Sequence, residues 1–171
     1  MGDDWMKAFL YQLGWNTKGI GIELGSFVGL STCLIAMGMR DSPWQEGKMI
    51  CVDWWKDGYL GMTDMLKKFN ENISSFGVEK YIQQYQGSCE DEKLVPKVKA
   101  EWLWLDASHY RAELRVNIDI YYPMVKPNGL ILWHDTHMEE VLLHIEEVKE
   151  EFGITPVITN RPDFQVWKKP L

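Results

Sequence analysis

The sequence has few cysteines, no long apolar run and no basic N-terminus. Its three cysteines, Cys33, Cys51 and Cys89, form no C-x-x-C pair, which argues against a zinc ribbon or a redox pair and fits a reducing compartment. No apolar stretch approaches the ~20 residues that span a bilayer. The opening MGDDWMKAFL is acidic, unlike the basic start of a signal peptide. We therefore expect a cytoplasmic protein without a membrane partner.

Basic residues are also in short supply. Lys and Arg number 18 against 25 Asp and Glu, a net charge of −7, which argues against nucleic acid as a partner because phosphates require a basic face. A hydrophobic content of 46% is ordinary for a globular protein. The length of 171 residues predicts a single domain, 1–171, that can bury a core without metal or disulfide support.

The hydrophobic pattern alternates between strands and helices. Short apolar runs predict strands at 19–24, 48–53, 81–86, 101–105 and 130–133, followed by a hairpin in the tail. Periodic apolar residues predict helices at 3–13, 60–76 and 111–125, and the apolar run at 28–39 predicts a largely buried helix. Residues 90–99 predict a short charged helix that is broken or kinked near Pro96, and residues 126–129 predict a turn. A last helix follows a capping box of Thr136 and Glu139. This order predicts an α/β, Rossmann-like, doubly wound fold, with a mostly parallel seven-stranded sheet and a C-terminal antiparallel hairpin.

Polar and glycine residues gather where the predicted strands end. Such sheets bind ligands at the carboxyl ends of their strands. The clusters are Glu23 to Gly29, Asp53, Gly87-Ser88, Asp106 to His109, and His134-Asp135. Their convergence predicts a ligand site along one edge of the sheet.

The first cluster reads E-x-G-x-x-x-G-x-S, from Glu23 through Gly25, Ser26 and Gly29 to Ser31. Glycine lets the backbone approach a ligand closely, and the helix behind it offers unpaired N–H groups. The early acid would repel a phosphate but would suit a cationic ligand such as an amine or a sulfonium. The alternative is a turn whose glycines serve only the backbone.

Asp53 ends the second strand, where an acid commonly accepts the hydroxyls of a ribose. Trp54 or Trp55 beside it would pack against a purine ring, and Ser88 would hydrogen-bond the edge of that ring. The structural alternatives are helix-capping roles for Asp53 and Ser88.

Together these motifs resemble the class I S-adenosylmethionine-dependent methyltransferases. The resemblance runs from about residue 19 to the C-terminus. It implies that S-adenosylmethionine is the cofactor, that the glycine turn passes under its methionyl part and that Asp53 binds its ribose. The cofactor-binding residues would be Glu23, Gly25, Ser26, Gly29, Ser31, Asp53, Trp54, Ser88 and Asp106.

A second constellation follows the fourth and fifth strands. The segments Asp106-Ala107-Ser108-His109-Tyr110, Lys126-Pro127-Asn128-Gly129 and His134-Asp135 are similar to those of the macrocin-O-methyltransferase-like subgroup, which acts on sugars and small molecules. Ala107 and Asn128 stand where that subgroup usually has glycines.

Asp106 and Asp135 should project into one cleft from adjacent strand ends. Two close carboxylates suit a divalent cation such as Mg²⁺, with His134 as a possible third ligand. A bound ion would acidify a substrate hydroxyl, and His109 would take its proton as general base. The alternatives are that Asp106 binds only the methionyl amine, that His109 caps a helix and that His134 is a buried structural histidine.

We therefore expect a metal-assisted O-methyltransferase that acts on a small hydroxylated molecule, such as a sugar. Two other classes remain open: a metal-dependent hydrolase that uses Asp106, Asp135 and His134, and a non-catalytic nucleoside-binding protein. The short chain offers no obvious lid, so a homo-oligomer could complete the pocket. Exposed aromatic anchors for such an interface would be Trp5, Trp15 and Trp44.

Overall fold

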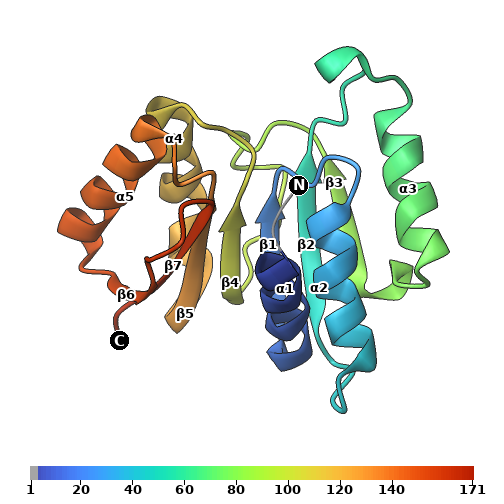
Figure 1. Cartoon of the computed structure of the whole chain (residues 1–171), viewed down its shortest axis with the longest axis horizontal. Helices are drawn as coiled ribbons and strands as arrows, with labels where there is room; N and C mark the ends of the chain where they lie inside the picture. Colours follow the sequence, from blue (N-terminus) through green and yellow to red (C-terminus); the bar gives the residue numbers. More distant parts are fainter. Residues whose placement is uncertain (1–3) are drawn as a thin grey trace.

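A seven-stranded sheet forms the centre of the computed structural model, which describes residues 4–171 (Figure 1). The strand order is β3-β2-β1-β4-β5-β7-β6; β1 to β5 run parallel, and β7 runs antiparallel to both β5 and β6. The strands are β1 Ile20–Leu24, β2 Lys48–Asp53, β3 Ile82–Gln86, β4 Ala100–Leu105, β5 Val125–His134, β6 Thr155–Ile158 and β7 Phe164–Lys168. The predicted fold class is confirmed.

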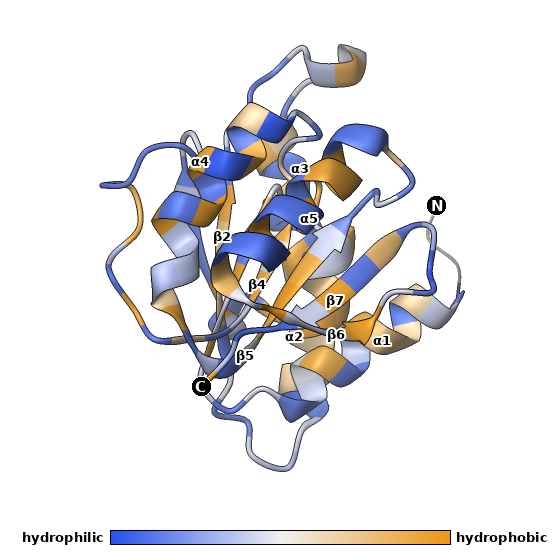
Figure 2. Cartoon of the chain, turned by 90° about the vertical axis from the view of Figure 1, so that its left-hand side faces the viewer, coloured by the Kyte–Doolittle hydropathy of each residue, from blue (hydrophilic) through white to orange (hydrophobic). Residues whose placement is uncertain are grey.

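Helices cover both faces of this sheet. They are α1 Asp4–Asn16, α2 Leu30–Asp41, α3 Met65–Ser75, α4 Arg111–Tyr121 and α5 Glu139–Phe152. Position 3 of the predicted first helix lies outside the described residues. Alternation along each strand gives two cores: Leu103 and Leu105 face α4 and α5, whereas Trp102 and Trp104 face α1, α2 and α3. In Figure 2 the strands carry hydrophobic stretches, while α5 carries hydrophilic stretches on the side that faces the viewer.

The chain order places β1 between β2 and β4, although β4 follows β3 in sequence. At this switch point the connections from β1 and β4 leave in opposite directions along the sheet edge and open a crevice between them. The first glycine turn and Asp106 therefore meet at the same place. Asp106 N–H donates to the Leu24 carbonyl at 2.9 Å, which ties the end of β4 to the end of β1.

The helix predicted at 60–76 begins only at Met65. Tyr59–Gly61 form a single 3-10 turn, and Leu60 (φ 50°) and Asp64 (φ 57°) have left-handed backbones. A right-handed helix cannot pass through such residues. The segment between β2 and α3 is therefore a loop.

The helix predicted at 90–99 does not form, and residues 87–99 are turns, bends and irregular chain. Pro96 has no N–H to donate to a helix. Leu94, Val95 and Val98 instead pack against the core beneath α4 and α5. The prediction of a helix rested on the charged residues of this segment and did not take into account that its apolar side chains pack into the core.

The helix predicted at 111–125 ends at Tyr121, and the turn predicted at 126–129 lies inside β5. Val125 already pairs with Ala100, and the next pair is Leu130 with Trp102, so four residues of β5 stand opposite one residue of β4 and the register shifts. Asn128, one of these four, adopts φ 62°.

The capping box predicted at Thr136 is also wrong. Helix α5 begins after Met138 without a side-chain cap. Thr136 is buried, and its hydroxyl donates toward the carbonyls of Arg161 and Pro162. It therefore joins the start of the α5 segment to the β6–β7 hairpin.

The three tryptophans expected to anchor a second subunit differ in exposure. Trp15 is partly buried. Trp5 stacks on Phe164, with ring centroids 5.3 Å apart, and Lys18 Nζ lies 3.7 Å from the centroid of the exposed Trp44 ring. Homo-oligomerisation stays a prediction. No helix within residues 4–171 is long and apolar enough to cross a membrane.

Candidate active site

A cavity of about 730 Å³ opens at the carboxyl ends of β1, β2 and β4. It brings together residues from both predicted constellations. The lining residues are Gly25, Phe27, Asp53, Trp54, Lys56, Asp57, Gly58, Tyr59, Leu60, Met65, Cys89, Asp106, Ala107 and His109. Three of the five strand ends that the sequence singled out, those of β1, β2 and β4, therefore share one cavity.

The glycine turn after β1 depends on its two glycines. Gly25 (φ 88°) and Gly29 (φ 90°) both have backbones that other residues rarely adopt. A Cβ on Gly25 would lie 2.4 Å from the Asp106 carbonyl oxygen. Glycine at 25 thus lets the turn lie against the end of β4 while its backbone lines the cavity.

Glu23 lies beneath this turn and is fully buried. Its carboxylate accepts hydrogen bonds from Ser26 Oγ (2.7 Å), Ser31 Oγ (2.6 Å) and Thr32 Oγ1. Burial raises the pKa of Glu23, and these hydroxyls oppose that shift. The carboxylate and the two serine hydroxyls thus hold the turn in shape from below, instead of pointing into the cavity as a direct contact with a cationic ligand would require.

Asp53 ends β2 at the cavity wall. Its Oδ2 accepts the Phe27 N–H at 2.8 Å, and its Oδ1 accepts the Trp55 N–H at 2.6 Å. The carboxylate therefore fixes the glycine turn to the next loop. Of the two candidate tryptophans, Trp54 lines the cavity and is 54% exposed, whereas Trp55 is buried in the core.

Ser88 contributes less directly than the sequence suggested. Its hydroxyl accepts the Glu90 N–H at 3.1 Å and so closes a local turn. The neighbouring Cys89 lines the cavity instead. The alternative of a helix cap is not observed either, because no helix follows Ser88.

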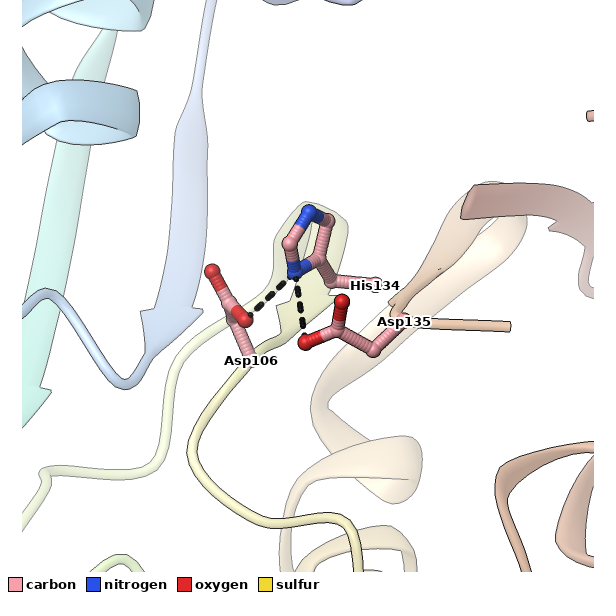
Figure 3. Close-up of side chains that lie close together, drawn as sticks. All are labelled: Asp106, His134 and Asp135. Atoms are coloured by element: carbon pink, nitrogen blue, oxygen red, sulfur yellow. Dashed lines mark ion pairs between the residues drawn. The ribbon is translucent and has the colours of Figure 1, made fainter. Parts of the chain in front are cut away.

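Asp106, His134 and Asp135 form a compact cluster beside the cavity (Figure 3). His134 Nδ1 lies 2.9 Å from Asp106 Oδ1 and 3.1 Å from Asp135 Oδ2. Each residue offers one potential ligand atom, and these three atoms lie within 4.8 Å of one another. The predicted trio of metal ligands therefore converges, although the end of β4 supplies one residue and the end of β5 the other two.

The charged groups of the cluster shift one another's pKa values. Burial alone would lower the pKa of His134, but the Asp106 and Asp135 carboxylates outweigh it and raise that pKa to about 10. The close contact with His134 in turn lowers the pKa of Asp135 to about 2. Without a metal, a charged imidazolium thus compensates the two carboxylates; a divalent cation would serve the same purpose.

His109 extends the cluster into the cavity. Its Nε2 lies 2.7 Å from Asp135 Oδ2, and its side chain lines the cavity wall. The more exposed His137 lies 3.9 Å, Nδ1 to Oδ1, from the same aspartate. Asp135 has a left-handed backbone (φ 51°), a strained conformation that concentrates at functional sites.

The sequence reasoning missed one wall of the cavity. Lys56, Asp57, Tyr59 and Leu60 come from the loop between β2 and α3, part of which the periodicity had assigned to a helix. Gly58 and Gly61, both with positive φ, were the available signals of a loop at a ligand-binding strand end.

Comparison with known proteins agrees with this geometry. A family model described as a methyltransferase domain matches residues 22–136, which span β1 to the start of the β5–α5 connection and hold every residue of the cluster. The chain belongs to this methyltransferase family. The predicted enzyme class, a class I S-adenosylmethionine-dependent methyltransferase, is confirmed.

Solved structures show the same fold at low sequence identity. The O-methyltransferase NovP gives a TM-score of 0.81 at 15% identity, over 97% of this chain and 80% of NovP. The Podospora anserina methyltransferase PaMTH1, bound to S-adenosylhomocysteine (SAH), gives 0.76 at 13% identity, over 100% and 80%. An O-methyltransferase from Bacillus cereus, in complex with SAH, gives 0.71 at 13% identity, over 100% and 83%. No curated protein matches the chain by sequence.

Proposed function

We propose that this methyltransferase transfers a methyl group to an oxygen of a small hydroxylated molecule, such as a sugar, with the help of a divalent metal ion. The observation that carries the proposal is the shared cavity: Gly25 and Asp53 line it together with Asp106 and His109. The groups proposed to bind the cofactor and the group proposed to accept a proton thus line the one space in which the methyl acceptor would bind. The O-methyltransferases with the same fold support the choice of oxygen.

Each cofactor-facing residue has a distinct role in this proposal. The backbone at Gly25 would lie under the methionyl part, and the Asp53 carboxylate would accept the ribose hydroxyls with its remaining lone pairs. The exposed Trp54 ring provides an apolar face for the adenine. Glu23, Ser26, Gly29 and Ser31 act indirectly, by holding the turn that carries Gly25.

The residues of the cluster fit a divalent ion. His134 Nδ1 is buried and has no aligned hydrogen bond within the described part of the chain, although two carboxylates lie at ion-pair distance. Asp106, His134 and Asp135 would hold the ion. When bound, the cofactor supplies an electrophilic methyl group on a positively charged sulfur, and the metal lowers the pKa of a hydroxyl that binds it.

His109 is the proposed general base. Because Asp135 engages Nε2, Nδ1 is the ring nitrogen that takes the acceptor's hydroxyl proton, and Asp135 stabilises the imidazolium that forms. The base and the cofactor wall flank the same space, so positioning supplies much of the catalysis. The subgroup resemblance of the His134-Asp135 segment and the exposed Tyr59 ring on the cavity wall support a sugar-like acceptor.

Calorimetry with SAH, with and without Mg²⁺ or Co²⁺, tests the proposal. We expect SAH to bind in either condition and the divalent ion to bind separately. Metal binding without SAH binding would favour a hydrolase, and SAH binding without any metal effect on turnover would remove the metal from the mechanism. A cytoplasmic location and the exclusion of nucleic-acid partners remain predictions from the composition.

A further inference from the structure

The metal ligands proposed above are unequal in chemistry. Asp106 and Asp135 offer carboxylate oxygens, whereas His134 offers an imidazole nitrogen. Mg²⁺ and Ca²⁺ prefer oxygen ligands, while Co²⁺, Zn²⁺, Ni²⁺ and Fe²⁺ gain from imidazole. The identity of one side chain thus bears on which ion the site retains.

The His134 ring is placed as a ligand, with its donor atom toward the carboxylates. Nδ1 lies 2.9 Å from one carboxylate and 3.1 Å from the other, and this atom is buried without an aligned hydrogen bond in the described structure. An imidazole that served only as a structural donor would align its N–H with one acceptor. Here Nδ1 faces the space between the carboxylate oxygens of Asp106 and Asp135, as Figure 3 shows.

The surroundings hold the ring and one carboxylate in this arrangement. The His134 ring packs against the buried Trp104, with centroids 5.7 Å apart. Asp135 is fixed by its left-handed backbone and by the contact of Oδ2 with His109 Nε2. Outer contacts of this kind orient metal ligands and strengthen binding.

We propose that His134 is a direct nitrogen ligand that makes this site select a transition ion of the Co²⁺ or Zn²⁺ type over Mg²⁺. The inference rests on the proposed metal assistance, and it assigns the selectivity to this one side chain. Asp106 and Asp135 supply affinity for any divalent ion, and the imidazole supplies the preference.

Titration of the metal-free protein with Co²⁺, alone and in competition with Mg²⁺, tests the assignment without any need for activity. We expect Co²⁺ to bind at least about 100-fold more tightly than Mg²⁺. In the NMR spectrum of the Co²⁺ protein, coordination through Nδ1 leaves an Nε2–H, which should give one strongly shifted, exchangeable imidazole resonance.

Three variants test whether the Co²⁺ preference and the shifted resonance depend on His134. His134→Asp should keep Mg²⁺ binding, lose the shifted resonance and lower the Co²⁺-over-Mg²⁺ preference by about tenfold or more. His134→Asn gives a second variant of similar size in case the aspartate unfolds the protein, and it should lose the same resonance. His137→Gln, on the more exposed neighbour of Asp135, is the matched control and should leave both the resonance and the preference unchanged.

An unchanged preference or a surviving resonance in His134→Asp or His134→Asn would overturn the nitrogen-ligand assignment. A wild-type protein that binds Mg²⁺ as tightly as Co²⁺ would also overturn it, while metal assistance would stand. No binding of either ion would remove both. SAH binding is measured separately, so the methyltransferase assignment does not depend on these results.

Discussion

Gly25 lies so close to Asp106 that a Cβ at position 25 would sit 2.4 Å from the Asp106 carbonyl oxygen. The two residues belong to different halves of the proposed site, the cofactor side and the acceptor side. Their contact joins the ends of β1 and β4, so the two halves of the proposed site adjoin. The first prediction follows from this contact.

Gly25→Ala should destabilise the fold and impair cofactor binding. The left-handed backbone alone costs about 1–3 kcal/mol, and the clash with backbone atoms of Asp106 and Ala107 adds to it. Chemical denaturation and SAH calorimetry measure the two effects. Gly77→Ala is the control, because Gly77 also has positive φ but a Cβ there would meet no atom of the described residues within 4 Å. Equal losses in both variants would show that the contact with Asp106 is unimportant.

Asp53→Ala should weaken SAH affinity by about 1–3 kcal/mol, the order expected when hydrogen bonds to a charged group are lost. Part of the loss comes from the two loop N–H groups that the carboxylate now holds. Calorimetry measures the affinity. Glu92→Gln, an exposed acid in the 87–99 segment, should have no effect. An unchanged affinity in Asp53→Ala would mean that the ribose is bound elsewhere.

His109→Ala should reduce turnover by ~10²–10⁴ while SAH binding persists, because a general base contributes about that factor. His137→Ala should retain most of the activity, since His137 is more exposed and lies farther from Asp135. Steady-state rates at saturating cofactor provide the measurement. A near-normal rate for His109→Ala would leave that residue only a structural role.

His144 should make the fold sensitive to acid. It is fully buried in α5 beside Trp133, and burial lowers its pKa to about 4. The unfolded chain takes up a proton on this residue below pH ~6.5, whereas the folded protein resists it until about pH 4. Above pH ~6.5, His144 should therefore not change the free energy of unfolding. As the pH drops from there to about 4, its contribution should lower that free energy by up to about 3 kcal/mol.

Denaturation at several pH values compares the wild type with His144→Leu. Neither ring nitrogen of His144 has a hydrogen-bond partner among the described residues, so the apolar variant should fold and should lose this part of the acid slope. His137→Gln should keep the slope. The same slope in His144→Leu and the wild type would assign the acid sensitivity to other groups.

The fold was predictable because its strands are short apolar runs with polar ends. The runs that became β2, β4 and β5 are bounded by Asp53, Asp106 and Asp135, and this pattern also indicated the edge that carries the site. The prediction failed where packing overrides local pattern. Residues 90–99 have charges typical of a helix, but their few apolar side chains anchor an irregular segment to the core.

The direction in which a side chain points was harder to predict than its place. Glu23 and Asp53 both end strands in the sequence, yet one is buried under the glycine turn and the other lines the cavity. Alternation along a strand separates the two faces, but it does not say which side chain at the edge turns inward. The cavity wall around Tyr59 and Leu60 escaped prediction because it depends on left-handed loop residues that no periodicity reveals.

The central claim is that one cavity holds the methyl donor on the Gly25–Asp53 side and the reacting hydroxyl on the Asp106–His109 side. Difference density from crystals soaked with SAH and Co²⁺ tests it most directly. We expect the ribose hydroxyls at the Asp53 carboxylate, the sulfur above Gly25 and an ion among Asp106, His134 and Asp135. Density for SAH outside this cavity, or none at millimolar concentration, would contradict the account.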